Sequence, residues 1–571
     1  MLRTVSRALC ALARLWPTPV AEPDLALERQ LSFLGLPLSG DAVIRAGYSG
    51  GVAAAVIVGV VAAALGVTGQ LAVLGAATTG LAVVHGVHRT PAALAAAART
   101  RALCSASDLI GRVVLRARIT AAVEPAAVFA ARTGEGPLAR SLGEHVHRAA
   151  ASPDSGLESF AAAWRPWFPA LERAVDLVET AVDAPAAERP QLFDGALSVV
   201  VDATHERMSS FAADVRGPAT AIYAFGVLLP LALVGVFPAA RVAGVAVSLT
   251  LLSVVYDLLL PVALLAASGW LLVRRPVTFA TPSVPRDHPD ARVPWWRPVL
   301  AGVAAAGLSW VASTAVAGPW AAPVVATGAA VGASLAVRFR PAMGVRNHAR
   351  TVEDGLPDAL SLVGRRVRDG TSVEAAVAAV GTELSGETAA VFAAAAGVQR
   401  RLGVTLEEAF LGEFGALSRV PSPRTRAAVA LLSVAAVEGR PAGETVVALA
   451  DQLDELRRAE RAGRRELAAV CGTLANTAAV FGPLVGGATV ALAARMAHVE
   501  AGPGVSETFS IPGLGTVLGG YVFVMAATLT ALATGLESGL DRTRLGYRIG
   551  VALLLAAATF LVGIVAADAL V

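Results

Sequence analysis

The sequence contains no lysine. All 47 residues counted as Lys or Arg in this chain of 571 residues are therefore arginines. A Walker A phosphate loop, Schiff-base chemistry and a Ser–Lys pair each need a lysine amine, so these three kinds of site are excluded. The three cysteines, Cys10, Cys104 and Cys471, have no metal-type or disulfide-type spacing, and we expect them to be reduced apolar side chains. No cofactor or metal site is expected.

Charge and aromatic side chains are also scarce. Charged residues make up 16% and aromatic residues 5% of the chain, against 55% hydrophobic residues, and the mean hydropathy is +0.63. A single soluble domain does not have this composition, so we expect an integral membrane protein. Alanine and valine fill most apolar positions, which suits close helix packing in lipid.

Nine hydrophobic stretches are long enough to cross a bilayer as helices of roughly 20 residues. We expect an all-α polytopic membrane protein with two helical-bundle domains. Its predicted parts are an amphipathic N-terminal segment (1–48), spans 1 and 2 (49–88), a first helical domain (89–218), spans 3 and 4 (219–273), a loop (274–297), spans 5 and 6 (298–337), a second helical domain (338–470), spans 7 and 8 (471–536) and span 9 (547–571). Arg14 interrupts the first apolar run, which favours a basic helix at the membrane surface over a cleavable signal peptide.

Arginines between the spans predict the orientation. They flank the second domain and occupy the loops before span 5 and before span 9, whereas the segment 499–513 carries Glu500 and Glu507 and no arginine. Only Arg241 breaks this pattern. Positive charge favours the cytoplasmic side, so we expect the N-terminus and both helical domains in the cytoplasm and the C-terminus outside the plasma membrane.

Several short sequences occur twice in the same order. FGVL at 225–228 returns as FGPL at 481–484, VEPAAV at 123–128 returns as VEAAV at 373–377, and GLESF at 156–160 aligns with TLEEAF at 405–410. The order indicates a parallel internal duplication with a degraded first copy. A duplicated membrane scaffold with two domains on one side favours a mechanical part over an enzyme.

Helix signals in the second domain are local and specific. Leu356, Leu360 and Val363 form one apolar stripe, and Gly370 should end their helix. The predicted capping boxes and helix start are Thr371-x-x-Glu374, Thr405-x-x-Glu408 and Pro423. A last helix should begin near Glu444 and run without interruption into span 7.

The segment 354–467 resembles the cytoplasmic domain of the type II secretion F, or type IV pilus-assembly platform, family. The matching elements are LPDALSLVGRRVRDGTSVEAAV, GVTLEEAF and EGRPAGETVVALADQLDELRRAER, followed by a span. Two such domains in one chain are similar to the archaeal branch, which includes archaellum and adhesion-pilus platforms. Bacterial Tad systems resemble it too, usually as two proteins.

This resemblance implies a function. Platform proteins of the family lie beneath a growing filament, bind a cytoplasmic secretion ATPase and couple its cycle to the insertion of pilin subunits. They hydrolyse nothing themselves, so the resemblance implies a protein that is not an enzyme. It also implies a homodimer and no nucleic-acid partner.

Eight arginines are candidate contacts of that ATPase: Arg365, Arg366, Arg368, Arg457, Arg458, Arg461, Arg464 and Arg465. Fixed positive charge can attract an acidic protein surface. The alternative is that these side chains anchor the protein to anionic lipid headgroups. Glu455, Glu460 and Glu466 within the same run predict i,i+4 pairing along the helix.

Asp257 is the candidate functional residue within the membrane, since a carboxylate in a span is costly. It could contact a pilin helix or pair with an arginine, or lie nearer an interface if Pro261 breaks the span. Pro230 and Pro483 also lie in predicted spans, where they can kink helices.

Other classes of protein remain open. A transporter or channel would need several inward-facing charges in its spans, and only Asp257 qualifies. GYSGG at 47–51 matches the G-x-S-x-G nucleophile motif of a membrane protease, although no strand precedes it and no histidine is placed as the base of Ser49. Within the resemblance, the residues do not separate pilus, archaellum and secretion platforms.

Overall fold

The computed structural model describes residues 9–16, 18, 25–36, 38–64, 69–103, 105–134, 136–150, 155–242, 249–275, 284–285, 287–438, 442–499 and 511–570. Every regular element within these ranges is a helix. Cys104 and Arg286 lie outside them. The chain forms two compact units, one of residues 1–102 with 273–275 and one of residues 103–272 with 276–571.

The first unit is small and contains α2 (Leu25–Phe33), α3 (Gly40–Ala64) and most of α4 (Gly69–Leu103). Leu27, Leu31 and Val43 form its buried core. Ser49 lies inside α3 and its hydroxyl donates to the carbonyl of Arg45 at 3.0 Å, so the strand–turn–helix geometry of a nucleophile motif is absent at this serine.

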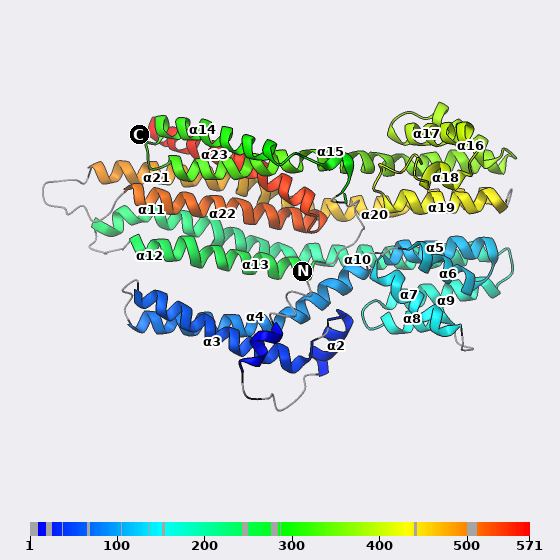
Figure 1. The fold of residues 1–571 in the computed structure, drawn as a ribbon, viewed down its shortest axis with the longest axis horizontal. Coiled ribbons are helices and arrows are strands. Elements are labelled where there is room, and N and C mark those ends of the chain that lie inside the picture. Colours follow the sequence, from blue (N-terminus) through cyan, green and yellow to red (C-terminus); the bar gives the residue numbers. More distant parts are fainter. Residues whose placement is uncertain are drawn as a thin grey trace. The chain divides into compact units, whose positions relative to one another are not determined.

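The helices that follow α4 belong to the second unit (Figure 1). Its smaller helices are α5 (Ala106–Thr120), α6 (Val123–Thr133), α7 (Pro137–Ala149), α8 (Gly156–Trp164), α9 (Pro169–Asp183), η3 (Pro289–Ala291), α16 (Val373–Glu383), α17 (Glu387–Leu402), α18 (Leu406–Leu411) and α19 (Pro423–Glu438). The long and apolar ones are α10 (Arg189–Tyr223), η1 (Ala224–Leu228), α11 (Leu229–Val242), α12 (Leu249–Ser253), η2 (Val254–Leu259), α13 (Leu260–Arg274), α14 (Trp296–Val316), α15 (Ala322–Arg368), α20 (Ala442–Asn476), η4 (Thr477–Phe481), α21 (Gly482–Val499), α22 (Ile511–Ser538) and α23 (Arg542–Leu570).

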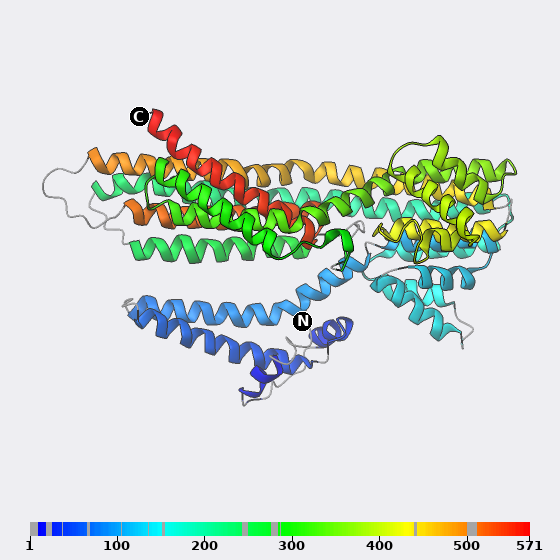
Figure 2. The same cartoon turned by 45° about the horizontal axis from the view of Figure 1, so that its top comes forward.

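Helices α15 and α20 each belong to two hydrophobic cores. The N-terminal half of α15 places Val325 and Ala329 in an apolar bundle with α21, α22 and α23, and its C-terminal half places Leu360 in the core of the smaller helices α16 to α19. In α20 the order is reversed, with Val446 in the smaller core and Leu474 in the bundle. Figures 1 and 2 show both helices running from one core to the other.

Local sequence signals account for most boundaries of the second helical domain. Thr405 caps α18, because its hydroxyl accepts from the backbone N–H of Glu408 at 3.2 Å, as predicted. Pro423 opens α19 as predicted. The prediction for α16 was wrong by one residue, because Ser372 and not Thr371 occupies the cap position. Either hydroxyl suits a cap, and the register of the following core positions decides between them.

Eight helices among the described residues are long and apolar enough to cross a membrane. Each of them overlaps one of the nine predicted spans, so eight of the nine have a matching helix. The remaining span, predicted in 49–88 near Leu71 to Val87, lies on the continuous helix α4, which is not among the eight. The described part of the chain is therefore all-helical, and its apolar helices are those of a multi-pass membrane protein.

Glycines allow helices of the bundle to pack with their backbones almost in contact. A Cβ atom on Gly487 of α21 would lie 2.1 Å from the carbonyl oxygen of Phe560, and one on Gly563 of α23 would lie 2.1 Å from that of Leu484. Neither oxygen can move away, because each belongs to a helical backbone. Close approach of small residues is a main source of attraction between helices in lipid.

We predict that Gly563→Ala lowers the stability of the bundle by about 1–3 kcal/mol, because its new methyl group overlaps a backbone carbonyl. The matched control is Gly307→Ala in α14, where an added Cβ atom meets nothing within 4 Å. Thermal unfolding of both variants in detergent measures the difference. Equal melting temperatures would show that α21 and α23 do not pack this closely.

Candidate functional site

A group of charged side chains in the second unit lies between α15, α19 and α20. These helices surround a cavity of about 150 Å³. Its charged lining residues are Arg350, Glu353, Asp354, Arg424, Arg457, Glu460, Arg461 and Arg464. We call this group the ionic cluster.

Glu460 of α20 holds two arginines of the ionic cluster. One carboxylate oxygen pairs with Arg424 of α19 at 3.1 Å and the other with Arg464, one turn further along α20. Burial lowers the pKa of Arg424, but the neighbouring carboxylates Glu460 and Glu353 outweigh this and hold its pKa above the usual value. The guanidinium is therefore a fixed charge that ties α19 to α20.

Two further contacts join α15 to the same place. The hydroxyl of Ser422 donates to Glu353 of α15 at 2.5 Å and accepts from the backbone N–H of Thr425 at 3.0 Å. The same hydroxyl therefore caps α19 and connects this helix to α15. Arg457 of α20 pairs with Asp354 of α15 at 2.8 Å. Three helices therefore meet at one network of charge-assisted bonds.

Arg346 extends the network toward the membrane. Its side chain is fully buried and pairs with Asp541, whose other carboxylate oxygen accepts from the backbone N–H of Thr543 at 3.1 Å at the start of α23. Sequence reasoning did not single out Arg346, Glu353, Arg424 or Asp541. The only sign of Arg346 in the sequence is that an arginine falls on the stripe of α15 that is buried. From sequence alone such an arginine is interpreted as charge that flanks a membrane span.

The eight predicted arginines form two groups in the structure. Arg365, Arg366 and Arg368 lie in the last turn of α15, beside Gly443 at the start of α20. The other five, Arg457, Arg458, Arg461, Arg464 and Arg465, lie on α20 from 14 residues beyond Gly443, a distance of roughly 20 Å along a helix. The two groups therefore do not make one continuous patch.

Several of these arginines already have partners. Arg366 pairs with Glu383, and Arg458 with Asp454 at 2.5 Å, besides the pairs of Arg457 and Arg464. The exposed side chains of Arg365, Arg368, Arg461 and Arg465 have no ion pair among the described residues. These four have guanidinium groups available for a partner.

Among the residues that the structure describes, the bundle contains three π-helical turns, each followed by a proline two residues after its end. Turns η1, η2 and η4 precede Pro230, Pro261 and Pro483. Proline has no N–H for the carbonyl four residues earlier, and its ring crowds that carbonyl. A π turn widens the helix at this point, and such turns often mark functional sites.

Hydroxyl groups from other helices bind two of the carbonyls that these prolines leave without a partner. The Tyr521 hydroxyl of α22 donates to the carbonyl of Gly226, four residues before Pro230. The Thr559 hydroxyl of α23 lies 3.1 Å from the carbonyl of Ala479, four residues before Pro483, and shares its one proton between this carbonyl and that of Leu555 in its own helix at 2.8 Å. In lipid an unpaired carbonyl is expensive, so these contacts fix how the helices lie against each other.

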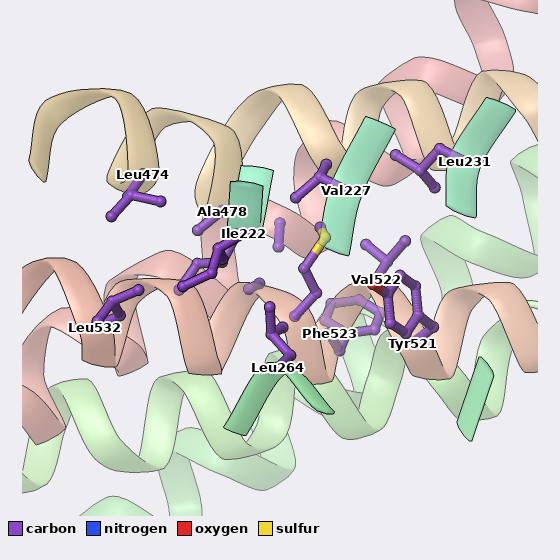
Figure 3. Close-up of a cluster of buried hydrophobic side chains, with 14 of the residues drawn as sticks. Ile222, Val227, Leu231, Leu264, Leu474, Ala478, Tyr521, Val522, Phe523 and Leu532 are labelled. Atoms are coloured by element: carbon purple, nitrogen blue, oxygen red, sulfur yellow. The ribbon is translucent and has the colours of Figure 1, made fainter. Parts of the chain in front are cut away.

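Asp257 lies on the third turn, η2, and is exposed. The neighbouring Tyr256 is buried, donates to the carbonyl of Pro230 at 2.6 Å and meets the ring of Tyr521 edge-on at 5.6 Å. Figure 3 shows Tyr521 among the apolar side chains of this part of the bundle. A Cβ atom on Gly520 would lie 3.1 Å from a carboxylate oxygen of Asp257, so this carboxylate reaches α22.

The arrangement offers fixed charge between α15, α19 and α20 and three proline-associated π turns among the described residues of the bundle. Among the described residues no three His, Cys, Asp or Glu side chains lie close enough to hold a metal ion. No family model, no curated protein and no solved structure matches the chain. The function must therefore be argued from the residues and the helices themselves.

We predict that Glu460→Gln destabilises the second unit by about 3–5 kcal/mol, because it leaves two partly buried guanidinium groups without their carboxylate. Asp454→Asn is the matched control on the same helix. It breaks a more exposed pair with Arg458 and should cost about 1 kcal/mol or less. Chemical unfolding followed by circular dichroism compares them, and equal costs would rule out a structural role of the ionic cluster.

We predict that Tyr521→Phe costs about 1–3 kcal/mol, because the carbonyl of Gly226 then has no donor in an apolar bundle. Pro230→Ala restores a backbone N–H for the same carbonyl. In that background Tyr521→Phe should therefore cost less, which a double-mutant cycle of unfolding free energies measures. Additive costs would show that the hydroxyl does not replace the missing N–H.

Proposed function

We propose that this protein is the membrane platform of a type IV pilus-like machine, that is, of a pilus, archaellum or type II secretion system. In this role it binds a cytoplasmic secretion ATPase and passes the motion of that enzyme to pilin subunits in the membrane, without catalysing a reaction itself. The observation that carries the proposal is α20. It runs for 35 residues from the core of the polar domain into the apolar bundle as one helix.

The proposal includes an internal duplication, and the helix boundaries support it. Helices α6 and α16 each have 11 residues and begin 250 positions apart, at Val123 and Val373. The N-caps of α7 and α17, Gly136 and Gly386, are also 250 positions apart and have φ angles of 95° and 96°.

The long helices repeat in the same way. Both α10 and α20 have 35 residues, and each continues through a five-residue π turn into an apolar helix. Two copies of one unit, each leading from small helices into the membrane, suit a part that transmits force at two places. The FGVL and FGPL sequences fall at these two π turns and the residues beside them.

The orientation belongs to the same proposal. With both polar domains and the N-terminus in the cytoplasm and the C-terminus outside the plasma membrane, the arginines on α15 and α20 face the compartment of the ATPase. Arg365, Arg366 and Arg368 are one contact surface of this kind and Arg457, Arg458, Arg461, Arg464 and Arg465 a second. A homodimer would present each surface twice, and Asp257 would face a pilin or another span.

The test begins with the full chain solubilised from its own cells in mild detergent. We expect a secretion ATPase and pilin subunits to co-purify with it, which mass spectrometry identifies. A stable complex with a solute-binding or metabolic protein in their place would favour the transporter alternative and contradict the platform.

We predict that inserting two glycines after Arg464 keeps the ATPase bound but abolishes filament assembly, because glycines interrupt the continuous helix between the two cores. The matched control inserts two glycines after Gly386, in the exposed turn between α16 and α17. Filaments counted by electron microscopy and ATPase measured by co-purification give separate readouts. Normal filaments in the first variant would contradict force transmission through α20.

A further inference from the structure

A second cavity lies further along α20, where this helix meets α22 and α23. Its volume is about 680 Å³, within the range of small-molecule sites. We call it the α20–α23 groove. Its lining residues are Arg464, Arg465, Ala468, Cys471, Gly472, Ala475, Asn476, Ala479, Thr530, Thr534, Glu537, Tyr547, Arg548, Val551, Ala552 and Leu555.

The groove is charged at one end and apolar along its length. Arg464, Arg465 and Arg548 supply three positive charges at this end, and Glu537 is the one carboxylate among the lining residues. Both oxygens of Glu537 are already used, one by Arg548 and the other by Arg544. Arg465 has no ion pair among the described residues, so the charged end has positive charge to spare.

The apolar part of the groove also contains two buried hydroxyl groups. Thr530 and Thr534 line the groove one helical turn apart and are 4% and 0% exposed. Neither hydroxyl has a hydrogen-bond partner within the part of the chain that the structure describes. A buried hydroxyl without a partner costs free energy, so an occupant with polar atoms just below its charged end would satisfy the site better than hydrocarbon alone.

We propose that the α20–α23 groove binds one anionic phospholipid. Its phosphate would lie at Arg465 and Arg548, because guanidinium groups bind phosphate through paired hydrogen bonds. Its ester oxygens would reach the Thr530 and Thr534 hydroxyls, and one acyl chain would lie along Ala475 and Leu555. Basic pockets between membrane helices at the level of the headgroups have this character.

The site would place a lipid against the helix that joins the two cores. Arg464 belongs both to this groove and to the ionic cluster, where it pairs with Glu460. A bound headgroup would therefore stabilise α20 at the point where it leaves the polar domain. This inference stands apart from the proposed function, because it concerns a ligand of the bundle whatever the machine does.

The experiment titrates the delipidated, detergent-purified full chain with phosphatidylglycerol and follows bound lipid by native mass spectrometry. Phosphatidylcholine and inorganic phosphate are the comparison ligands. We expect one phosphatidylglycerol to bind at least about tenfold more tightly than phosphatidylcholine, the equivalent of about 1.4 kcal/mol. Equal binding of the two lipids would overturn the proposal. Complete displacement of phosphatidylglycerol by inorganic phosphate alone would also overturn it, because that result would indicate an anion site without a lipid.

Two pairs of variants separate the groove from general membrane binding. Gly472→Leu fills the groove, and an added Cβ atom there meets nothing within 4 Å, so the fold should tolerate it; Gly307→Leu is its control on α14. Arg465→Gln removes the unpaired charge, and Arg461→Gln, one turn away and outside the groove, is its control. We expect Gly472→Leu and Arg465→Gln to weaken binding about tenfold or more and the controls to leave it unchanged. Unchanged binding in Gly472→Leu would overturn the proposal.

Discussion

The sharing of two long helices by two cores is the constraint on which the rest of this structure depends. A helix cannot bend sharply without losing backbone hydrogen bonds, so α15 and α20 fix the small helices of the polar domain to the apolar bundle. The ionic cluster lies where these two helices leave one core for the other. Charge pairs there oppose sliding of α20 along α15, because each pair can form in only one alignment of the two helices.

Within the bundle, prolines lead to contacts that fix one helix against another. Each π turn with its proline gives up a backbone hydrogen bond that a straight helix would keep, and lipid offers no water to replace it. At two of these turns a neighbouring helix brings a hydroxyl to the carbonyl: Tyr521 donates to Gly226, and Thr559 shares its proton between Ala479 and its own helix. A weak point in one helix thus becomes a contact between two, and a change in helix packing must break or remake that contact.

These features suit a protein that transmits force more than one that performs chemistry. Charge is gathered at the boundary between the polar domain and the bundle, and the bundle joins its helices through glycine contacts and hydroxyl bonds. The α20–α23 groove adds a place where the lipid composition of the membrane could influence α20. The platform function and the lipid site are independent proposals with separate tests.

The sequence by itself determined the helical class, the apolar segments, and local boundary signals such as the Thr405 cap and the helix start at Pro423, because these depend on local composition and periodicity. Eight of the nine predicted spans follow from the same signal. The i,i+4 pairing predicted for Glu460 is confirmed by its contact with Arg464. The tertiary structure alone decided that Arg457 pairs with Asp354, that Glu460 also pairs with Arg424, and that the eight predicted arginines fall into two groups. A run of arginines has the same sequence pattern whether its side chains contact lipid, carboxylates or solvent. Arg458 and Arg464 find carboxylates one turn away on α20, but the partner of Arg457 lies on α15, and only the packing of the two helices brings that partner within reach.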